Sequence, residues 1–185
     1  MEEEFELDPG QLPADFYVTS DTWFGRTQIL QIANRLNFNT IEEMNTTLIK
    51  NWNKKVKKDD IVIHLGNFAW DPATARSVLK KLNGKILFLY SNDDDALLEV
   101  AEEFDNVLLI NEQICLAQEH DIVLSHYPLH TWPGKETGTL HIHGHLPFSH
   151  KTNFSIEKRV NACTDFWSYA PIQLSTLKEL IDEIN

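Results

Sequence analysis

Seven short runs rich in β-branched and aromatic residues, several of them ending in polar residues, constrain what this chain can fold into. They are FYVTS, IVIHLG, KILFLY, NVLLI, DIVLSH, TLHIHGH and KRVNACTD. Runs of this length and composition are typical of β-strands. Helical patterns separate the early runs and another follows the last run. This order predicts an α/β protein with a central pair of sheets flanked by helices.

Three segments are predicted to form the main helices. The first begins at Thr40, whose hydroxyl can cap the helix while Glu43 reaches back to the same turn. The second begins after Asp71, with Pro72 at the first helical position. The last is LSTLKELIDEI, and its predicted buried stripe is Leu174, Leu177, Leu180, Ile181 and Ile184.

The chain of 185 residues, 42% of them hydrophobic, fits one domain with a substantial core. We expect residues 15–185 to form that domain and residues 1–14, with five acids and no Lys or Arg, to be an acidic N-terminal extension. Phe5 and Leu7 leave open a partner-binding motif within this extension. No apolar run approaches the roughly 20 residues that cross a bilayer. The start MEEEFELDPG lacks the features of a secretory signal, so we expect a cytoplasmic protein with no membrane contact.

The formal net charge of −12 opposes non-specific binding to nucleic acid, because a polyanion is repelled by an acidic surface. Cys115 and Cys163 are the two cysteines and do not make a disulfide framework. Trp70, Trp132 and Trp167 can each belong either to the core or to an interface.

Polar clusters follow five of the predicted strands: SDTWFG, HLGNFAW, YSNDDD, SHYPLH and HIHGHLP. Open α/β sheets place their sites at these carboxyl ends. The order of the clusters resembles the calcineurin-like metallophosphoesterase family, especially its small bacterial and phage members. Its motifs are Asp-x-His, Gly-Asp, Gly-Asn-His-Asp/Glu, a lone His and Gly-His-x-His. The resemblance implies a four-layer α/β/β/α sandwich with a metal site at one rim.

The family's chemistry uses two divalent cations, which clamp phosphate oxygens and activate a bridging water. By resemblance, the first cation would be bound at the positions of Asp21, Trp23, Asn67 and Pro147. Trp23 offers an N–H donor without a lone pair, and Pro147 has no side-chain ligand atom. The first cation is therefore predicted to be absent.

The second cation would, by resemblance, be bound by Asn67, Asn92, His126 and His145. Asn67 stands where the family has the bridging Asp, and an amide oxygen brings a dipole where a carboxylate would bring a charge. Imidazole remains a good ligand for borderline metals. We therefore expect either no cofactor or one weakly bound divalent metal, Zn, Mn or Ni.

Three further positions of this region bear on phosphate chemistry. Asp93 stands where the family has a His that assists the leaving group. Asp93 can act as a general acid only if its pKa is raised. The alternative is that it belongs to a surface acid cluster that caps a helix near Ala96. Arg26 can balance Asp21 or receive a phosphate group. Trp23 either fills the space of the missing metal or is an exposed anchor for a partner.

The other histidines are expected to be structural. His64 and His143 lie in apolar strands, which favours buried positions in the core or at its rim. His141 and His143 alternate with Ile142 and so share one face, which leaves open a displaced metal site there with His145 and His150.

These observations predict an inactive or crippled phosphoesterase homologue that works as a binding or scaffold protein with a protein partner. The alternatives are a phosphodiesterase or phosphatase that uses one metal, and a sensor that binds a nucleotide or another phosphate ligand. A laboratory origin of the changes is disfavoured, because Asp to Asn is a common trapping substitution whereas His to Trp and His to Pro are not.

Overall fold

The computed structural model describes residues 12–110, 114–117, 121–147, 154–155 and 158–183, with only the backbone described at 114–117 and 154–155. Two five-stranded mixed sheets form its centre. The first sheet has the order β10-β1-β2-β3-β4, with β10 Ile172–Gln173, β1 Tyr17–Thr19, β2 Ile61–His64, β3 Lys85–Leu89 and β4 Val107–Ile110. The second has the order β5-β6-β7-β9-β8, with β5 Ile114–Ala117, β6 Ile122–Ser125, β7 Leu140–His143, β9 Arg159–Asn161 and β8 Phe154–Ser155.

Most strands of each sheet run parallel, so their carboxyl ends lie at the same edge of that sheet. In the first sheet β1, β2, β3 and β4 run parallel, with Val18 opposite Ile63 and Ile63 opposite Leu87. In the second sheet β6, β7 and β9 run parallel, with Leu124 opposite Ile142. The strands β10, β5 and β8 pair antiparallel at the edges. All seven predicted strands are confirmed, whereas β5, β8 and β10 were not predicted.

Five helices complete the described fold: α1 Ile29–Ile32, α2 Ile41–Lys55, α3 Pro72–Leu79, α4 Asp95–Leu98 and α5 Leu174–Asp182. The predicted start of α2 is confirmed, because the Thr40 hydroxyl accepts the Glu43 backbone N–H and the Glu43 carboxylate reaches back to accept the Asn39 backbone N–H. The predicted start of α3 is confirmed as well, with Asp71 as its cap and Pro72 in its first turn. Short 3₁₀ helices occur at Ala101–Glu103, Lys135–Thr137 and Thr164–Phe166.

One hydrophobic core lies between the two sheets. Val18, Ile63 and Leu87 of the first sheet share it with Leu124 and Ile142 of the second. Helix α5 adds Leu174, Leu177 and Ile181 to this core, as its sequence pattern predicted, while Leu180 is half-buried and Ile184 lies outside the described residues. Leu12 also packs into this core, ahead of the expected start of the domain at residue 15.

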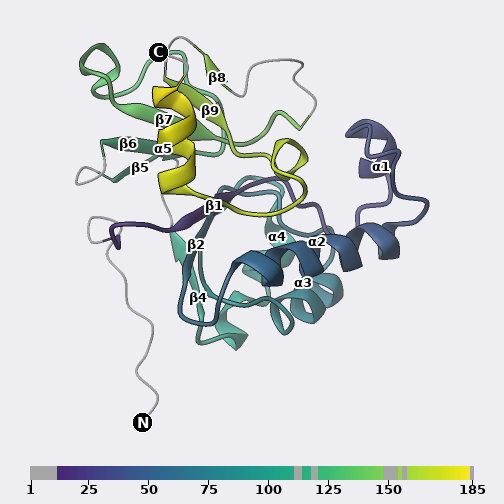
Figure 1. Ribbon diagram of the computed structural model, residues 1–185. Helices are drawn as coiled ribbons and strands as arrows, with labels where there is room; N and C mark the ends of the chain where they lie inside the picture. The colour runs from purple at the N-terminus through teal and green to yellow at the C-terminus, as the bar shows by residue number, and fades with distance from the viewer. Residues whose placement is uncertain (1–11, 111–113, 118–120, 148–153, 156–157, 184–185) are drawn as a thin grey trace.

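A second core fills the space between the first sheet and the helices. Met44, Leu48 and Trp52 of α2 pack there with Val62 and Phe88 of the sheet. Figure 1 shows α2, α3 and α4 gathered on one side of the first sheet, with the second sheet on the other side. The α/β class is therefore confirmed. In the part of the chain that the structure describes, no helix is long and apolar enough to cross a membrane.

The outer face of the second sheet carries the histidines of β7. The rings of His141 and His143 lie side by side, with centroids 5.3 Å apart, which confirms that they share a face. The loop after β6 covers them, because Trp132 packs on His141 and the Leu129 N–H donates to His141 Nε2. Burial lowers the pKa of each of these two histidines to about 4. Both are buried, as predicted for His143, and His64 is fully buried as well.

Candidate functional site

The carboxyl ends of the parallel strands of both sheets meet at one rim, and polar side chains gather there. Asp21 follows β1, Asn67 follows β2, His126 follows β6 and His145 follows β7. Contacts between the two sheets bring these four residues together. We refer to Asp21, Asn67, His126 and His145 as the rim cluster.

Asp21 is the centre of the rim cluster and has no exposed surface. Its Oδ1 accepts a hydrogen bond from Asn67 Nδ2 at 2.8 Å. Its Oδ2 accepts bonds from Ser20 Oγ at 2.6 Å, the His145 backbone N–H at 2.7 Å and Cys163 Sγ at 3.0 Å. Both carboxylate oxygens of Asp21 are therefore already hydrogen-bonded within the protein.

The pKa of the Asp21 carboxyl reflects opposing effects. Burial acts to raise it, but the nearby His126 and the hydrogen bonds from Ser20, Asn67 and Cys163 outweigh burial and hold the pKa below its ordinary value. An ionised Asp21 requires donors around it. It follows that Asn67 turns its NH₂ group, and not its carbonyl oxygen, toward this carboxylate.

The other end of the Asn67 amide points to Ser91. Asn67 Oδ1 lies 2.8 Å from Ser91 Oγ, which also lies 2.7 Å from Asp94 Oδ2. The hydroxyl has one proton, so it serves one of these acceptors at a time. In this arrangement Asn67 presents N–H groups to Asp21 and to His126, whose Nε2 is 3.4 Å away. An N–H group cannot bind a cation.

The two histidines of the rim cluster contact each other. His126 Nδ1 lies 2.6 Å from the Leu65 carbonyl oxygen, so this nitrogen carries a proton and donates a hydrogen bond to that oxygen. That Nε2 lies 3.2 Å from His145 Nδ1. Tyr127 packs on both rings, with centroid distances of 4.6 Å to each. Burial, followed by the neighbouring His126, lowers the pKa of His145.

Asp94 is a site residue that the sequence analysis missed. It is fully buried, and it accepts the backbone N–H groups of Asn67, Phe68 and Ser91 at 2.7 to 2.8 Å. The prediction of a surface acid cluster capping a helix is thus wrong for Asp94, whose side chain forms no capping bond to α4. The signal that could have identified Asp94 is its place at the fourth position of the Gly-Asn-His-Asp/Glu motif.

Asn92 and Asp93 do not join the rim cluster. Both are exposed, and the side chain of neither forms a hydrogen bond or ion pair with another residue that the structure describes. Pro147 is half-buried. The structure thus brings together four of the five predicted metal positions, and it leaves Asn92 apart.

Backbone strain is concentrated in this cluster. Asp21, Asn67 and His145 have φ values of 56°, 60° and 69°, and Trp23 has 51°. Residues other than glycine rarely adopt this left-handed region, and such strain persists where the surroundings hold it. Here Arg35 supplies part of that support. Its guanidinium donates to the carbonyl oxygens of Asp21 and Thr22 at 2.6 and 2.9 Å.

Arg35 is the second buried residue that the sequence analysis missed. It has no exposed surface, and it forms a two-pronged ion pair with Asp165 at 2.7 and 2.8 Å. The pair ties the segment between α1 and α2 to the 3₁₀ helix after β9. No sequence pattern pointed to it, because 130 positions separate the two residues.

Trp23 is 4% exposed and packs in the core beneath the helices. The alternative of an exposed anchor is therefore wrong for Trp23. Arg26, which was predicted to contact phosphate or balance Asp21, does not hydrogen-bond to Asp21: its guanidinium lies over Trp23 at 4.0 Å and over Trp70 at 5.0 Å. Trp70 is 53% exposed, whereas Trp132 is buried and Trp167 packs against the core between the sheets.

These donor atoms do not fit the family's dinuclear metal centre. Within the described residues, no three His, Cys, Asp or Glu side chains are arranged to hold one metal ion. The carboxylate of Asp21 is fully hydrogen-bonded, and Asn67 turns N–H groups toward it and toward His126. A pair of cations would have to displace this network, at the cost of its hydrogen bonds.

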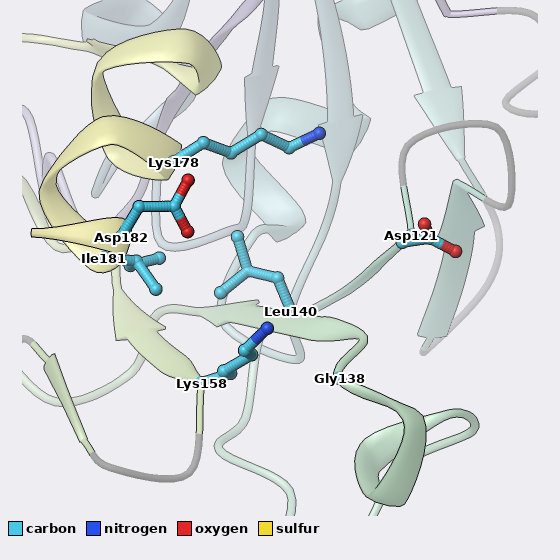
Figure 2. A pocket seen from close by; sticks show the side chains of 7 residues that line it. All are labelled: Asp121, Gly138, Leu140, Lys158, Lys178, Ile181 and Asp182. Atoms are coloured by element: carbon cyan, nitrogen blue, oxygen red, sulfur yellow. The ribbon is translucent and has the colours of Figure 1, made fainter. Parts of the chain in front are cut away.

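A separate hollow of about 200 Å³ lies near the C-terminal end of α5. Figure 2 shows the seven residues that line it: Asp121, Gly138, Leu140, Lys158, Lys178, Ile181 and Asp182. Asp121, Gly138 and Lys158 precede β6, β7 and β9, whereas His126, His145 and Cys163 follow the same strands. The hollow is therefore at the opposite end of the second sheet from the rim cluster.

The fold and the site together define an α/β protein of two mixed sheets with a hydrogen-bonded Asp-Asn-His-His cluster at one rim. No model of a known protein family matches the chain. It is 31% identical over 174 residues to the uncharacterized protein MJ1445 of Methanocaldococcus jannaschii. The aligned region covers 90% of this chain and 91% of that protein. The chain belongs to the same family as MJ1445.

A solved structure shares the fold. It is the crystal structure of the protein of unknown function AQ665 from Aquifex aeolicus, with a TM-score of 0.66 and 25% sequence identity. The likeness covers 90% of this chain and 99% of that one. These two relatives establish a family and a shared fold, so the activity has to be argued from the site.

Proposed function

We propose that this protein is a calcineurin-like phosphoesterase homologue in which hydrogen bonds replace the dinuclear metal centre, and that it acts as a binding or scaffold protein. The observation that carries the proposal is the 2.8 Å bond from Asn67 Nδ2 to Asp21 Oδ1. In the family a bridging aspartate stands at the position of Asn67, and its carboxylate would repel the one at the position of Asp21 without cations between them. In this protein the uncharged Asn67 amide donates a hydrogen bond to Asp21, so no cation is needed there.

The fold proposed with this function is the family's four-layer α/β/β/α sandwich. Two features support it: both sheets share one core, and α2 and α3 cover the outer face of the first sheet. The placement of the rim cluster at the carboxyl ends of β1, β2, β6 and β7 also agrees with the family's metal site. The resemblance in sequence supplies the remainder of the argument.

No side chain of the rim cluster is a hydroxyl or thiol nucleophile. Asp21 is ionised and enclosed by donors, and His126 uses its proton on the Leu65 carbonyl. Asp93, the residue at the leaving-group position, is exposed. A negative charge there repels a phosphate ester. A cytoplasmic location and a protein partner complete the proposal.

Elemental analysis tests this function directly. The purified protein is incubated with Mn²⁺, Zn²⁺ or Ni²⁺, passed through a desalting column and analysed for metal. We expect much less than one ion per chain and no hydrolysis of bis-p-nitrophenyl phosphate above that of a His126→Ala variant. Two ions per chain, together with hydrolysis that is lost in this variant, would overturn the proposal.

A phosphodiesterase or phosphatase with one metal is the second candidate, because one observation favours it. His126 Nε2 and His145 Nδ1 are 3.2 Å apart, which is close to the separation of two nitrogens bound to one Zn²⁺ ion, about 3.3 Å for bonds near 2.0 Å. Asn67 would then have to reverse its amide. One ion per chain with hydrolysis, both lost in His126→Ala and in His145→Ala, would favour this candidate over the first.

A further inference from the structure

Three side chains beside the rim cluster form a stack. The Arg26 guanidinium carbon lies 4.0 Å from the ring centroid of Trp23 and 5.0 Å from that of Trp70. Trp23 is buried, whereas Trp70 leaves 53% of its surface exposed. We propose that this stack is a binding site for a mononucleotide, with the phosphate on Arg26 and the base on Trp70.

The backbone fixes the stack in place. The Trp23 N–H donates to the Asn67 carbonyl at 3.0 Å, the Phe24 N–H to Phe68 at 2.9 Å, and the Trp70 N–H to Phe24 at 2.8 Å. The loops after β1 and β2 therefore continue as a paired ladder beyond the strands. A site whose residues are held in this way loses little conformational entropy when a ligand binds.

Arg26 forms no ion pair in the described part of the chain, and its Nε is buried without a hydrogen-bond partner. Asp71, the acid beside Gly25, directs its two oxygens to the backbone N–H and the hydroxyl of Thr74 and not to Arg26. A guanidinium that lies over aromatic rings can still donate its N–H groups to a phosphate, which accepts them as a bidentate partner.

The exposed indole identifies the second part of the ligand. Base stacking on an aromatic side chain tolerates any base, because every base has a π-face. A mononucleotide combines such a ring with an oxyanion, and it meets one local cation on a chain whose formal net charge is −12. A nucleic acid strand would meet that acidic surface along its length.

The proposal does not rest on the proposed function, because no side chain of the rim cluster is part of the stack. Binding is therefore measured in EDTA, where loss or gain of a metal has no effect. Tryptophan fluorescence is followed during titration with AMP, with adenosine and with inorganic phosphate. AMP should bind at least about tenfold more tightly than either of the others, because it makes both contacts.

Variants assign the contacts. Arg26→Gln should weaken AMP binding by about tenfold or more and leave adenosine unaffected, since it removes charge-assisted hydrogen bonds. Trp70→Ala, measured by calorimetry, should weaken both. Arg26→Lys keeps the charge but loses the planar stack, so it should also weaken AMP binding. Arg76→Gln is the matched control, because Arg76 is an exposed arginine paired with Glu103, and it should bind AMP as the wild type does.

Three results would overturn the proposal. The first is AMP binding no tighter than phosphate, which would remove the ring contact. The second is equal AMP binding by Arg26→Gln and Arg76→Gln when both variants melt at the wild-type temperature. The third is an Arg26-dependent preference for a single-stranded DNA oligonucleotide over AMP, which would make nucleic acid the ligand.

Discussion

Asn67 and Asp21, which follow neighbouring parallel strands, are joined by a side-chain hydrogen bond of 2.8 Å from the amide to the carboxylate. The bond is buried, and Asp21 is held ionised by it and by its other donors. An aspartate at position 67 would place a second carboxylate at this distance. The consequences of that change can be measured.

Asn67→Asp should lower the free energy of unfolding at pH 7 by about 2–5 kcal/mol, because two buried carboxylates would face each other in place of a hydrogen bond. The difference from wild type should shrink at pH 5, where one of the two can take a proton. Urea denaturation at both pH values measures it. Asn92→Asp adds the same charge on the exposed part of the rim, and equal losses in the two variants would contradict the arrangement described here.

Arg35→Ala should destabilise the protein by about 3–5 kcal/mol, because it leaves Asp165 as an unpaired charge and removes the donors to the carbonyl groups of Asp21 and Thr22. The matched control is Arg76→Ala, which breaks the solvent-exposed pair with Glu103 and should leave the free energy of unfolding nearly unchanged. Guanidinium denaturation compares the two variants. A loss in Arg35→Ala as small as that of the control would show that the buried pair is not structural.

Trp23→Ala should cost about 3–5 kcal/mol, because it opens a cavity in the core beneath the helices. Trp70→Ala removes an exposed ring and one cation–π contact, and it should cost about 1 kcal/mol or less. Thermal melting of both variants decides whether Trp23 fills space. If Trp23→Ala melted close to the wild type, the loop after β1 would have to close over the cavity.

Acid should destabilise this protein below about pH 6.5. Burial lowers the pKa of His64, His141 and His143 to about 4. An unfolded histidine has a pKa near 6.5, so between pH 6.5 and about pH 4 the unfolded chain binds protons that the folded chain does not. Their contribution to stability is complete above pH 6.5 and is lost as the pH falls, by about 1.4 kcal/mol per pH unit for each histidine.

His143→Gln should remove one of these three contributions. Plotted between pH 7 and pH 5, the free energy of unfolding of this variant should fall less steeply than that of the wild type. The expected difference in slope approaches 1.4 kcal/mol per pH unit at the acid end. Identical slopes would mean that His143 takes up its proton equally in the folded and unfolded states.

The sequence alone determined much of this protein. The alternation of short apolar runs predicted β1, β2, β3, β4, β6, β7 and β9, and capping residues such as Thr40 and Asp71 located the helix starts. Such features depend on residues a few positions apart. The resemblance to the metallophosphoesterase family also predicted that Asp21, Asn67, Asn92, His126 and His145 would meet at one rim, and all of these except Asn92 do.

Only the tertiary structure decided which side-chain atoms of those residues donate hydrogen bonds and which accept them. Whether Asn67 turns its oxygen or its NH₂ group toward Asp21 depends on Ser91 and on the charge of Asp21, which are brought close by folding. The burial of Asp94 and the pairing of Arg35 with Asp165 likewise depend on loops far apart in the chain. Hydrogen bonds and desolvation act over a few ångströms, so they are fixed by which segments pack together and not by local sequence pattern.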